Sequence, residues 1–226
     1  MRKLSIFCLF ALSLALLTAA CSGGPKQVTP ETKETAAKKS TGDPFYDAKA
    51  AIVHEIRNPE NKLVTLETNF GNMTLELFHD IAPNHADSFV ARSQDGFYNG
   101  TIFHRVVAGF MIQGGDPTGT GRGDAGYNLP AEFSDIPHVE GTLSAARSQD
   151  PNSASCQFFI CLDRNQSTEY LDGKYTVFGQ LIRGYDTLHR IGKVPVGPQP
   201  HGERSKPLNE VKLIRAWPSD AEGKPL

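Results

Sequence analysis

Apolar and polar residues alternate over many short segments of this chain, and the alternation predicts β-strands. The clearest segments are residues 63–68, 73–77, 142–145, 156–160, 176–179 and 211–214, which are rich in Val, Leu, Ile, Phe and Thr and are punctuated by glycine. Residues 69–72, around Gly71, are expected to turn the first strand back onto the second. The pattern therefore predicts a hairpin followed by further short strands.

Three segments instead repeat apolar residues every three or four positions, which is the period of an amphipathic helix: residues 44–57, 83–94 and 185–191. The first follows Asp43, a residue suited to an N-cap, and has Pro44 in its first turn. Many strands with few helices predict a mainly β domain, organised as a closed antiparallel barrel with helical plugs.

The first 20 residues differ in their pattern from the predicted β domain. Arg2 and Lys3 precede an apolar run over residues 4–17, and small residues then lead to Cys21. This order is that of a signal peptide, and the run is shorter than the roughly 20 apolar residues of a membrane span. It also resembles bacterial lipoprotein signals, in which the cysteine is lipidated and becomes the mature N-terminus. We expect lipidation of Cys21, with a free secreted chain as the alternative.

Four regions are expected along the chain: a lipoprotein signal peptide at 1–20, a lipidated flexible tether at 21–62 that includes the short helix at 44–57, a folded domain at 63–217 and a C-terminal tail at 218–226. The tether assignment rests on residues 22–41, where Lys, Thr, Glu, Pro, Gly and Ala leave too little apolar surface to offset the entropy of ordering.

Charge and cysteine content narrow the functional classes. The chain has 23 basic and 25 acidic residues, and residues 1–20 hold two of the basic ones, so the mature chain has a formal net charge of −4. A nucleic-acid partner is therefore not expected. Cys156 and Cys161 would lie about 16 Å apart on one strand, too far for a disulfide, and are expected to pack as small apolar side chains.

Three motifs closely resemble cyclophilins, the family of peptidyl-prolyl cis–trans isomerases. They are Phe-His-Arg-Val-Val-Ala-Gly-Phe-Met-Ile-Gln-Gly-Gly-Asp at 103–116, Ser-Cys-Gln-Phe-Phe-Ile at 155–160 and Leu-Asp-Gly-Lys-Tyr-Thr-Val-Phe-Gly at 171–179. The resemblance implies an eight-stranded antiparallel β-barrel capped by two helices, a proline-binding groove on its outer face, and no cofactor.

Rotation about an X-Pro bond has requirements that these residues fit. The barrier of ~18–20 kcal/mol arises because the nitrogen lone pair is delocalised into the carbonyl. A fixed guanidinium can donate to the prolyl nitrogen only as that lone pair localises, so it stabilises the twisted state selectively. The resemblance to cyclophilins implies this role for Arg105, and it implies that Gln113 bonds the substrate backbone and positions the arginine.

The resemblance also implies a pocket that holds the proline ring. Its residues, and those that contact the rest of the substrate, are Phe110, Met111, Ala146, Arg147, Gln157, Phe159, Tyr170, Leu171 and Tyr175. Strand alternation supports part of this set independently, because Met111 and Gln113 share one face of a strand. On another predicted strand Gln157 and Phe159 share a face, and Phe158 and Ile160 are expected to point into the barrel.

Three positions depart from the family pattern. Arg147 stands where many members have Asn, and we expect the contact there to be largely through the backbone. Tyr175 replaces a histidine near the pocket. Its ring should keep the pocket wall apolar there, and its hydroxyl should keep a polar tip. Tyr170 stands where several members have a tryptophan that bonds cyclosporin, so reduced sensitivity to that inhibitor is expected.

Other motifs are assigned no function. Residues 121–126 fit a dinucleotide-binding fingerprint, but no apolar strand precedes them and Pro130 interrupts the helix that should follow. His79, His85 and His104 lack the spacing of metal ligands and are interpreted as structural, so no metal is expected.

The sequence thus predicts a monomeric prolyl isomerase that assists the folding of exported proteins. It is expected in the bacterial cell envelope, on the periplasmic face of the outer membrane if the host has one, with proline-containing polypeptides and the membrane as partners. The alternative is a tethered chaperone or adaptor that binds proline peptides without significant isomerase activity.

Overall fold

The computed structural model describes residues 56–200 and 202–226. The expected signal peptide, Cys21 and nearly all of the expected helix at 44–57 lie outside these residues. The described elements are β1 (Lys62–Thr68), β2 (Gly71–Leu77), α2 (Pro83–Gln94), β3 (Arg105–Val107), β4 (Met111–Gly114), β5 (Thr142–Ala145), η1 (Pro151–Ser153), β6 (Phe158–Cys161), α3 (Gln166–Glu169), β7 (Val177–Arg183), α4 (Tyr185–Gly192), β8 (Val196–Pro198), β9 (Arg204–Pro207) and β10 (Leu213–Ser219).

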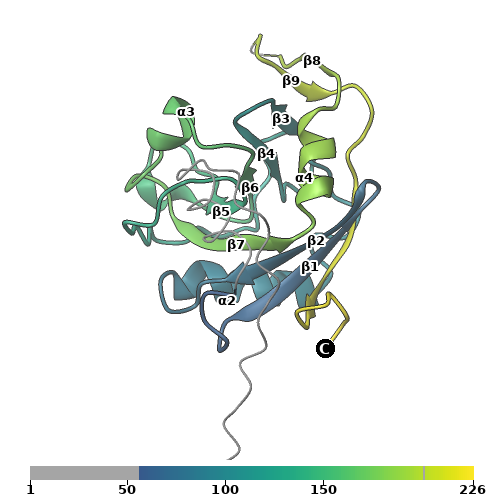
Figure 1. Ribbon diagram of the computed structural model, residues 1–226. Coiled ribbons are helices and arrows are strands. Elements are labelled where there is room, and N and C mark those ends of the chain that lie inside the picture. Colours follow the sequence, from purple (N-terminus) through teal and green to yellow (C-terminus); the bar gives the residue numbers. More distant parts are fainter. Residues whose placement is uncertain (1–55, 201) are drawn as a thin grey trace, which may run out of the picture. The chain divides into compact units, whose positions relative to one another are not determined.

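One curled antiparallel sheet forms the body of the domain, and its strands follow the order β10-β1-β2-β7-β5-β6-β4-β3 (Figure 1). The mainly β fold is thereby confirmed. Between the end strands β3 and β10 lies an isolated bridge from Ile102 to Lys212, with backbone hydrogen bonds beside it, in place of a strand ladder. Because residues 100–104 are irregular, the expected barrel is a curled sheet whose ends meet through this short contact.

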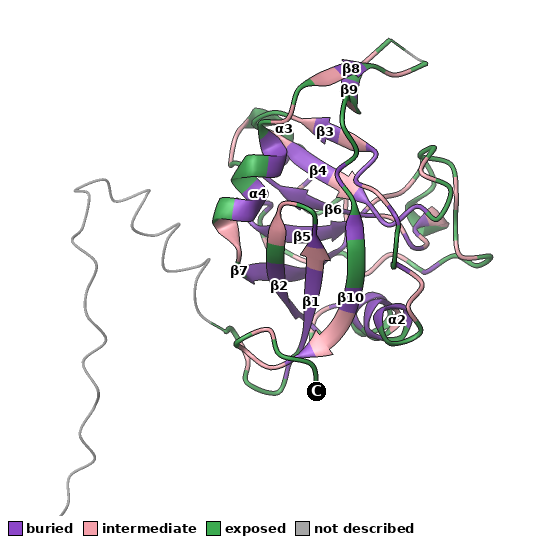
Figure 2. Ribbon diagram, turned by 90° about the vertical axis from the view of Figure 1, so that its right-hand side faces the viewer, coloured by how far each residue is buried: buried purple, intermediate pink, exposed green. Residues whose placement is uncertain are grey.

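The two helices predicted within the folded domain are confirmed. α2 spans the predicted residues 83–94 and buries Ala86, Phe89 and Val90, while α4 ends one residue later than predicted and buries Leu188 and Ile191. The two helices lie on opposite sides of the curled sheet (Figures 1 and 2). Each helix thus covers apolar side chains that the sheet leaves open.

The hairpin of β1 and β2 forms as predicted, with its turn at Asn69 and Phe70. Gly71 follows the turn with a φ of 127°, and a Cβ there would lie 2.6 Å from Thr187 Oγ1, so this position requires glycine. β10 pairs with the other edge of β1 and continues to Ser219, two residues past the expected domain end.

Alternation along β4 and β6 separates two apolar clusters. Ile112, Phe158 and Ile160 belong to the main core inside the curled sheet, as expected. Met111 and Phe159 belong instead to a small second cluster on the outer face. Figure 2 shows that most residues of β4, β6 and β7 are buried. The outer cluster is the floor of the site described next.

Candidate active site

Three neighbouring strands place the predicted site residues in one row on the outer face of the sheet. Arg105 on β3 lies directly opposite Gln113 on β4, and Gln113 lies directly opposite Phe159 on β6. Met111 lies two residues from Gln113 and therefore on the same face. The register of the sheet, and not a loop conformation, sets the spacing of these side chains.

A pocket of about 220 Å³ opens above this row. Its lining residues are Arg105, Phe110, Met111, Gln113, Ala146, Arg147, Phe159, Leu171 and Tyr175. Phe159 and Tyr175 meet edge to face, with ring centroids 6.0 Å apart and planes inclined by 77°. The pocket has an apolar floor and a polar rim on the Arg105 side, a form suited to a small apolar ring next to a peptide group.

A chain of side-chain hydrogen bonds runs along the polar rim. Arg105 Nη1 donates to Gln113 Oε1 at 3.3 Å, and Gln113 Nε2 donates to Gln157 Oε1 at 3.0 Å. Gln157 Nε2 in turn donates to the carbonyl of Gly123 at 2.9 Å. The chain connects the guanidinium to the glycine-rich loop and fixes the orientation of both amides.

Two predicted site residues do not line this pocket. Gln157 lines an adjoining cavity of about 420 Å³ together with Gln113, Arg147 and the loop around Gly123. Tyr170 lies outside both cavities and is 67% exposed, with Lys174 Nζ 3.7 Å from the centroid of its ring.

Arg147 contributes to the pocket through its side chain. The guanidinium lies over the ring of Tyr175, 4.3 Å from its centroid, and donates to the carbonyl of Lys174. It thereby holds one wall of the pocket through its side chain, which adds to the backbone contact expected at this position.

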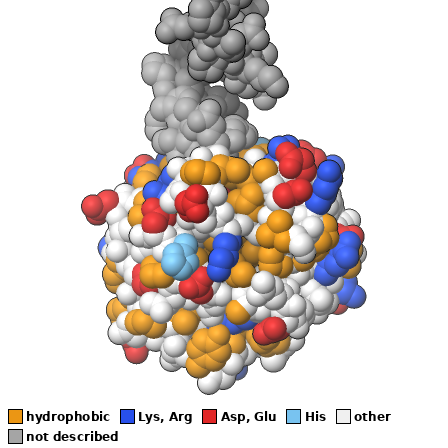
Figure 3. All heavy atoms as spheres, turned by 90° about the horizontal axis from the view of Figure 1, so that it is seen from below, with side chains coloured by type: hydrophobic (Ala, Val, Ile, Leu, Met, Phe, Trp, Pro, Cys, Tyr) orange, Lys and Arg blue, Asp and Glu red, His pale blue; other side chains and the backbone are white. Residues whose placement is uncertain are grey.

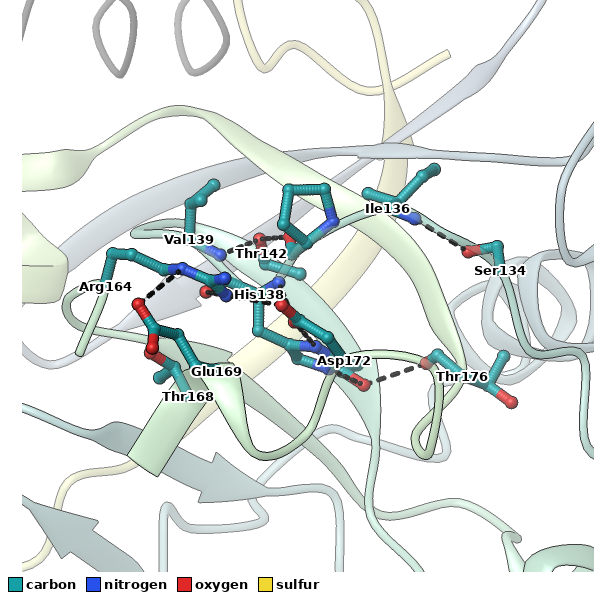
Figure 4. A network of polar contacts seen from close by, with 12 residues as sticks. Ser134, Ile136, His138, Val139, Thr142, Arg164, Thr168, Glu169, Asp172 and Thr176 are labelled. Carbon is teal, nitrogen blue, oxygen red and sulfur yellow. Dashed lines mark hydrogen bonds and ion pairs between the residues drawn. The ribbon is translucent and has the colours of Figure 1, made fainter. Parts of the chain in front are cut away.

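A polar network around His138 supports the pocket on the outer face of the sheet, where Ser144 of β5 is paired with Phe159 (Figure 4). His138 is fully buried, with Nδ1 3.0 Å from Asp172 Oδ1 and Nε2 3.0 Å from Ser144 Oγ. Arg164 Nη1 completes the network at 2.7 Å from Asp172 Oδ2. Since Asp172 directly follows the pocket residue Leu171, the network fixes the segment that carries this wall.

Comparison with known proteins agrees with this geometry. Residues 63–216 match the family model described as "Cyclophilin type peptidyl-prolyl cis-trans isomerase/CLD". The chain belongs to this family.

Individual proteins extend the comparison. Human peptidyl-prolyl cis-trans isomerase-like 1 is 40% identical over 176 residues, which cover 75% of this chain and 99% of that protein. A peptidyl-prolyl cis-trans isomerase of Synechococcus elongatus is 50% identical over 115 residues, covering 51% of this chain and 77% of that protein. A Cryptosporidium parvum cyclophilin, crystallised in the presence of the dipeptide Ala-Pro, has a TM-score of 0.64 and 35% identity, covering 70% of this chain and 99% of that chain.

The chain is therefore a cyclophilin-type peptidyl-prolyl cis–trans isomerase. Among the described residues, no group of three or more His, Cys, Asp or Glu side chains could hold a metal ion. Likewise, no helix within residues 56–200 and 202–226 has both the length and the apolar character needed to cross a bilayer.

His104 and Asp116 of this cyclophilin flank the polar rim without entering the pocket. Burial lowers the pKa of His104 below its usual value; the negative charge of Asp116 opposes this shift, and the positive charge of Arg105 adds to it. Burial alone would raise the pKa of Asp116, but hydrogen bonds from Thr118 and from the backbone of the glycine-rich loop lower it. Asp116 is thus an ionised anchor for that loop, and His104 is a neutral packing residue.

One residue of the site was missed by sequence reasoning. Glu203, on the hairpin of β8 and β9, accepts hydrogen bonds from Arg105 Nε and Nη2, both at 2.7 Å. The segment around it, rich in Pro and Gly, gave no periodic signal, and 98 residues separate the two partners. Only the folded chain brings them together.

Proposed function

We propose that this isomerase acts on X-Pro bonds of exported proteins in the bacterial cell envelope, with Arg105 as its catalytic residue. The observation that carries the proposal is the position of Arg105 Nη1, which lies on the rim of the apolar pocket, 3.3 Å from Gln113 Oε1 and 3.8 Å from Met111 Sδ. A proline ring in the pocket would bring its nitrogen near this donor.

In the proposed mechanism the apolar floor holds the proline ring while the preceding carbonyl rotates. In the planar ground state the prolyl nitrogen has no free lone pair, so Arg105 cannot form a strong hydrogen bond to it. In the twisted state the lone pair localises and the guanidinium donates to it, so binding is stronger in the transition state than in the ground state. Gln113 and Gln157 keep the donor in place and accept or donate to the substrate backbone. No nucleophile or proton transfer is needed.

The test compares Arg105→Ala and Arg105→Lys with the parent protein. We expect Arg105→Ala to lower kcat/KM by about 10²–10³, the scale for loss of one preorganised donor. Affinity for a proline peptide should change much less, because the apolar pocket remains. Arg105→Lys should restore activity only in part, since an ammonium lacks the planar fork of donors.

The measurement is cis–trans exchange of a proline peptide by NMR, run beside a binding titration on the same variants. Exchange in Arg105→Ala as fast as in the parent would refute the catalytic role. Peptide binding without exchange in the parent would favour the alternative, a tethered chaperone or adaptor.

The envelope location rests on the sequence before the described domain. An apolar run and small residues lead to Cys21, and Ser22 rather than Asp follows it, which favours the outer membrane in a host that has one. Acylation of Cys21, with palmitate among the chains, would hold the protein firmly because each buried methylene contributes about 0.8 kcal/mol. A monomer tethered in this way would meet exported chains as they fold.

Cys21→Ser tests the anchor. We expect the variant to move from the membrane fraction to the soluble fraction while the isomerase activity of the domain persists. A Cys8→Ser control should still fractionate with the membrane. If Cys21→Ser stays with the membrane in the same proportion as the parent, the lipid anchor is wrong.

A further inference from the structure

We propose that Glu203 is a positioning residue that orients Arg105 for catalysis. Its two carboxylate oxygens accept from Arg105 Nε and Nη2, each at 2.7 Å, in a bidentate pair. The inference rests on the catalytic role proposed for Arg105, and it makes the β8–β9 hairpin part of the active site.

The pair leaves one edge of the guanidinium available. Nε and Nη2 are engaged by Glu203, so Nη1 is the nitrogen directed to the rim of the proline pocket beside Gln113 and Met111. A bidentate carboxylate fixes the plane of a guanidinium as well as its distance. Glu203 therefore determines which N–H groups can meet the substrate.

Arg105 has space to move if this pair is absent. A second cavity of about 850 Å³ adjoins the proline pocket, and Arg105 and Gln113 line both. The other residues that line it are His104, Thr120, Gly121, Arg122, Gln199, Pro200 and Glu203. Without the carboxylate, the long arginine side chain could swing into this cavity and away from the proline.

Glu203 is itself held in place by the hairpin. Ser205, which is fully buried, donates from Oγ to Glu203 Oε2 at 2.6 Å. Gln199 on the facing arm donates from its backbone to the Glu203 carbonyl at 2.6 Å and from Nε2 to the His104 carbonyl at 3.1 Å. The hairpin is thus fixed to the residue before Arg105 as well as to its side chain.

The partial exposure of the Arg105–Glu203 ion pair indicates that Glu203 serves catalysis more than global stability. The side chains of Arg105 and Glu203 are 28% and 34% exposed, and ion pairs at such sites contribute little to global stability because water screens them. Catalysis, in contrast, is sensitive to misplacement of a donor by as little as about 1 Å. Loss of Glu203 should therefore lower turnover far more than it lowers stability.

The experiment measures kcat and KM for a proline peptide, together with urea unfolding, for Glu203→Ala, Glu203→Gln and Glu203→Asp. We expect Glu203→Ala to lower kcat about 10- to 100-fold, with KM and the unfolding midpoint close to the parent values. Glu203→Gln keeps the size of the side chain but leaves only one acceptor oxygen. Its kcat should therefore lie between those of Glu203→Ala and the parent. Glu203→Asp keeps the charge and should restore more activity than Gln.

An NMR signature accompanies the kinetics. In the parent, the Nε–H of Arg105 should give a distinct, slowly exchanging signal because a carboxylate holds it, and this signal should shift and exchange faster in Glu203→Ala. Glu210→Ala is the matched control: it removes an exposed carboxylate, whose side chain has no described partner, from the segment after the hairpin. It should change neither kcat nor the Arg105 signal.

The outcomes distinguish this inference from the proposal on which it rests. Parent-like kcat in Glu203→Ala, while Arg105→Ala is strongly impaired, would overturn the role of Glu203 and leave that of Arg105 intact. A rise in KM at unchanged kcat would overturn it as well. Full activity in Arg105→Ala would instead overturn the catalytic role of Arg105, whatever Glu203→Ala does.

Discussion

The imidazole of His138 lies nearly parallel to the ring of Phe159, with centroids 5.9 Å apart and planes inclined by 15°. Phe159 faces the proline pocket, and His138 lies beneath it, fully buried. Asp172 and Ser144 hold the two imidazole nitrogens. The floor of the pocket therefore depends on a side chain that no substrate can reach.

Removing this support should weaken both the fold and substrate binding. His138→Ala leaves a cavity under Phe159 and deprives Asp172 and Ser144 of a partner, so we expect a loss of about 2–4 kcal/mol in the free energy of unfolding. KM should rise more than kcat falls, because the pocket floor loosens while Arg105 is untouched. Urea unfolding and peptide kinetics measure the two effects. His79→Ala, at an exposed imidazole, is the control, and equal stability of the two variants would contradict the prediction.

Acid should destabilise the domain in two stages. Burial lowers the pKa of His85, His104 and His138, although Glu132 beside His85 and Asp172 beside His138 oppose the shift. Below about pH 6.5 the unfolded chain therefore binds protons that the folded chain excludes. The stability that these histidines contribute is complete above that pH and is lost as the pH falls towards their folded pKa values. Each can contribute a slope of up to about 1.4 kcal/mol per pH unit.

A second loss should follow at lower pH. The pKa values of Asp116, Glu132 and Asp172 are depressed because hydrogen bonds to the ionised forms outweigh burial, so their contribution is lost below about pH 4.5. Urea unfolding at a series of pH values measures both stages. His104→Gln should reduce the slope of the first stage. A level free energy of unfolding between about pH 7 and pH 5 would show that the buried histidines do not act in this way.

Tyr170 should affect inhibitor binding without affecting turnover. It lies outside the proline pocket, and its position in the family pattern is the one where a tryptophan bonds cyclosporin. Tyr170→Trp should tighten cyclosporin inhibition by up to about tenfold, the worth of one hydrogen bond. kcat/KM for a short proline peptide should stay within about twofold, since the pocket is unchanged. Tyr127→Trp, at another exposed tyrosine, should not alter inhibition, and equal inhibition of the two variants would reject the assignment.

Much of the fold could be predicted because local signals agree with the tertiary structure. Residues 83–94 form a helix at the predicted bounds, since Pro83 suits the first turn and the apolar residues recur at helical spacing. Strand alternation likewise sorted Phe158 from Phe159, and the structure places them in different apolar clusters. These signals depend on residues that are close together in the sequence, and the tertiary structure keeps the elements that they predict.

The features that were missed depend on contacts between distant segments. The β8–β9 hairpin has strands of three and four residues rich in Pro, Gly and charge, so alternation does not mark it. α3 is a single turn whose cap, Asn165, is its main local signal. The ends of the sheet meet through irregular backbone, which no periodic pattern describes. Glu203 could not be assigned to the site because nothing in its own neighbourhood points to Arg105.

On the face of the molecule seen in Figure 3, acidic and basic side chains are interspersed with apolar ones. Glu76 is different, because it is fully buried on the interior strand β2. Its carboxylate accepts from the backbone N–H groups of Arg57 and Asn58 at 2.8 and 2.9 Å, and from Gln180 Nε2 at 2.7 Å.

These bonds have a mechanical consequence. A pull on the chain that precedes Arg57 is transmitted through Glu76 to β2, which is paired on both sides with β1 and β7. The same chain continues into β1, which is paired with β10 and β2, so the load falls on strands that are held on both sides. Tension applied at the N-terminal end of the described domain therefore acts on interior strands and not on an edge strand.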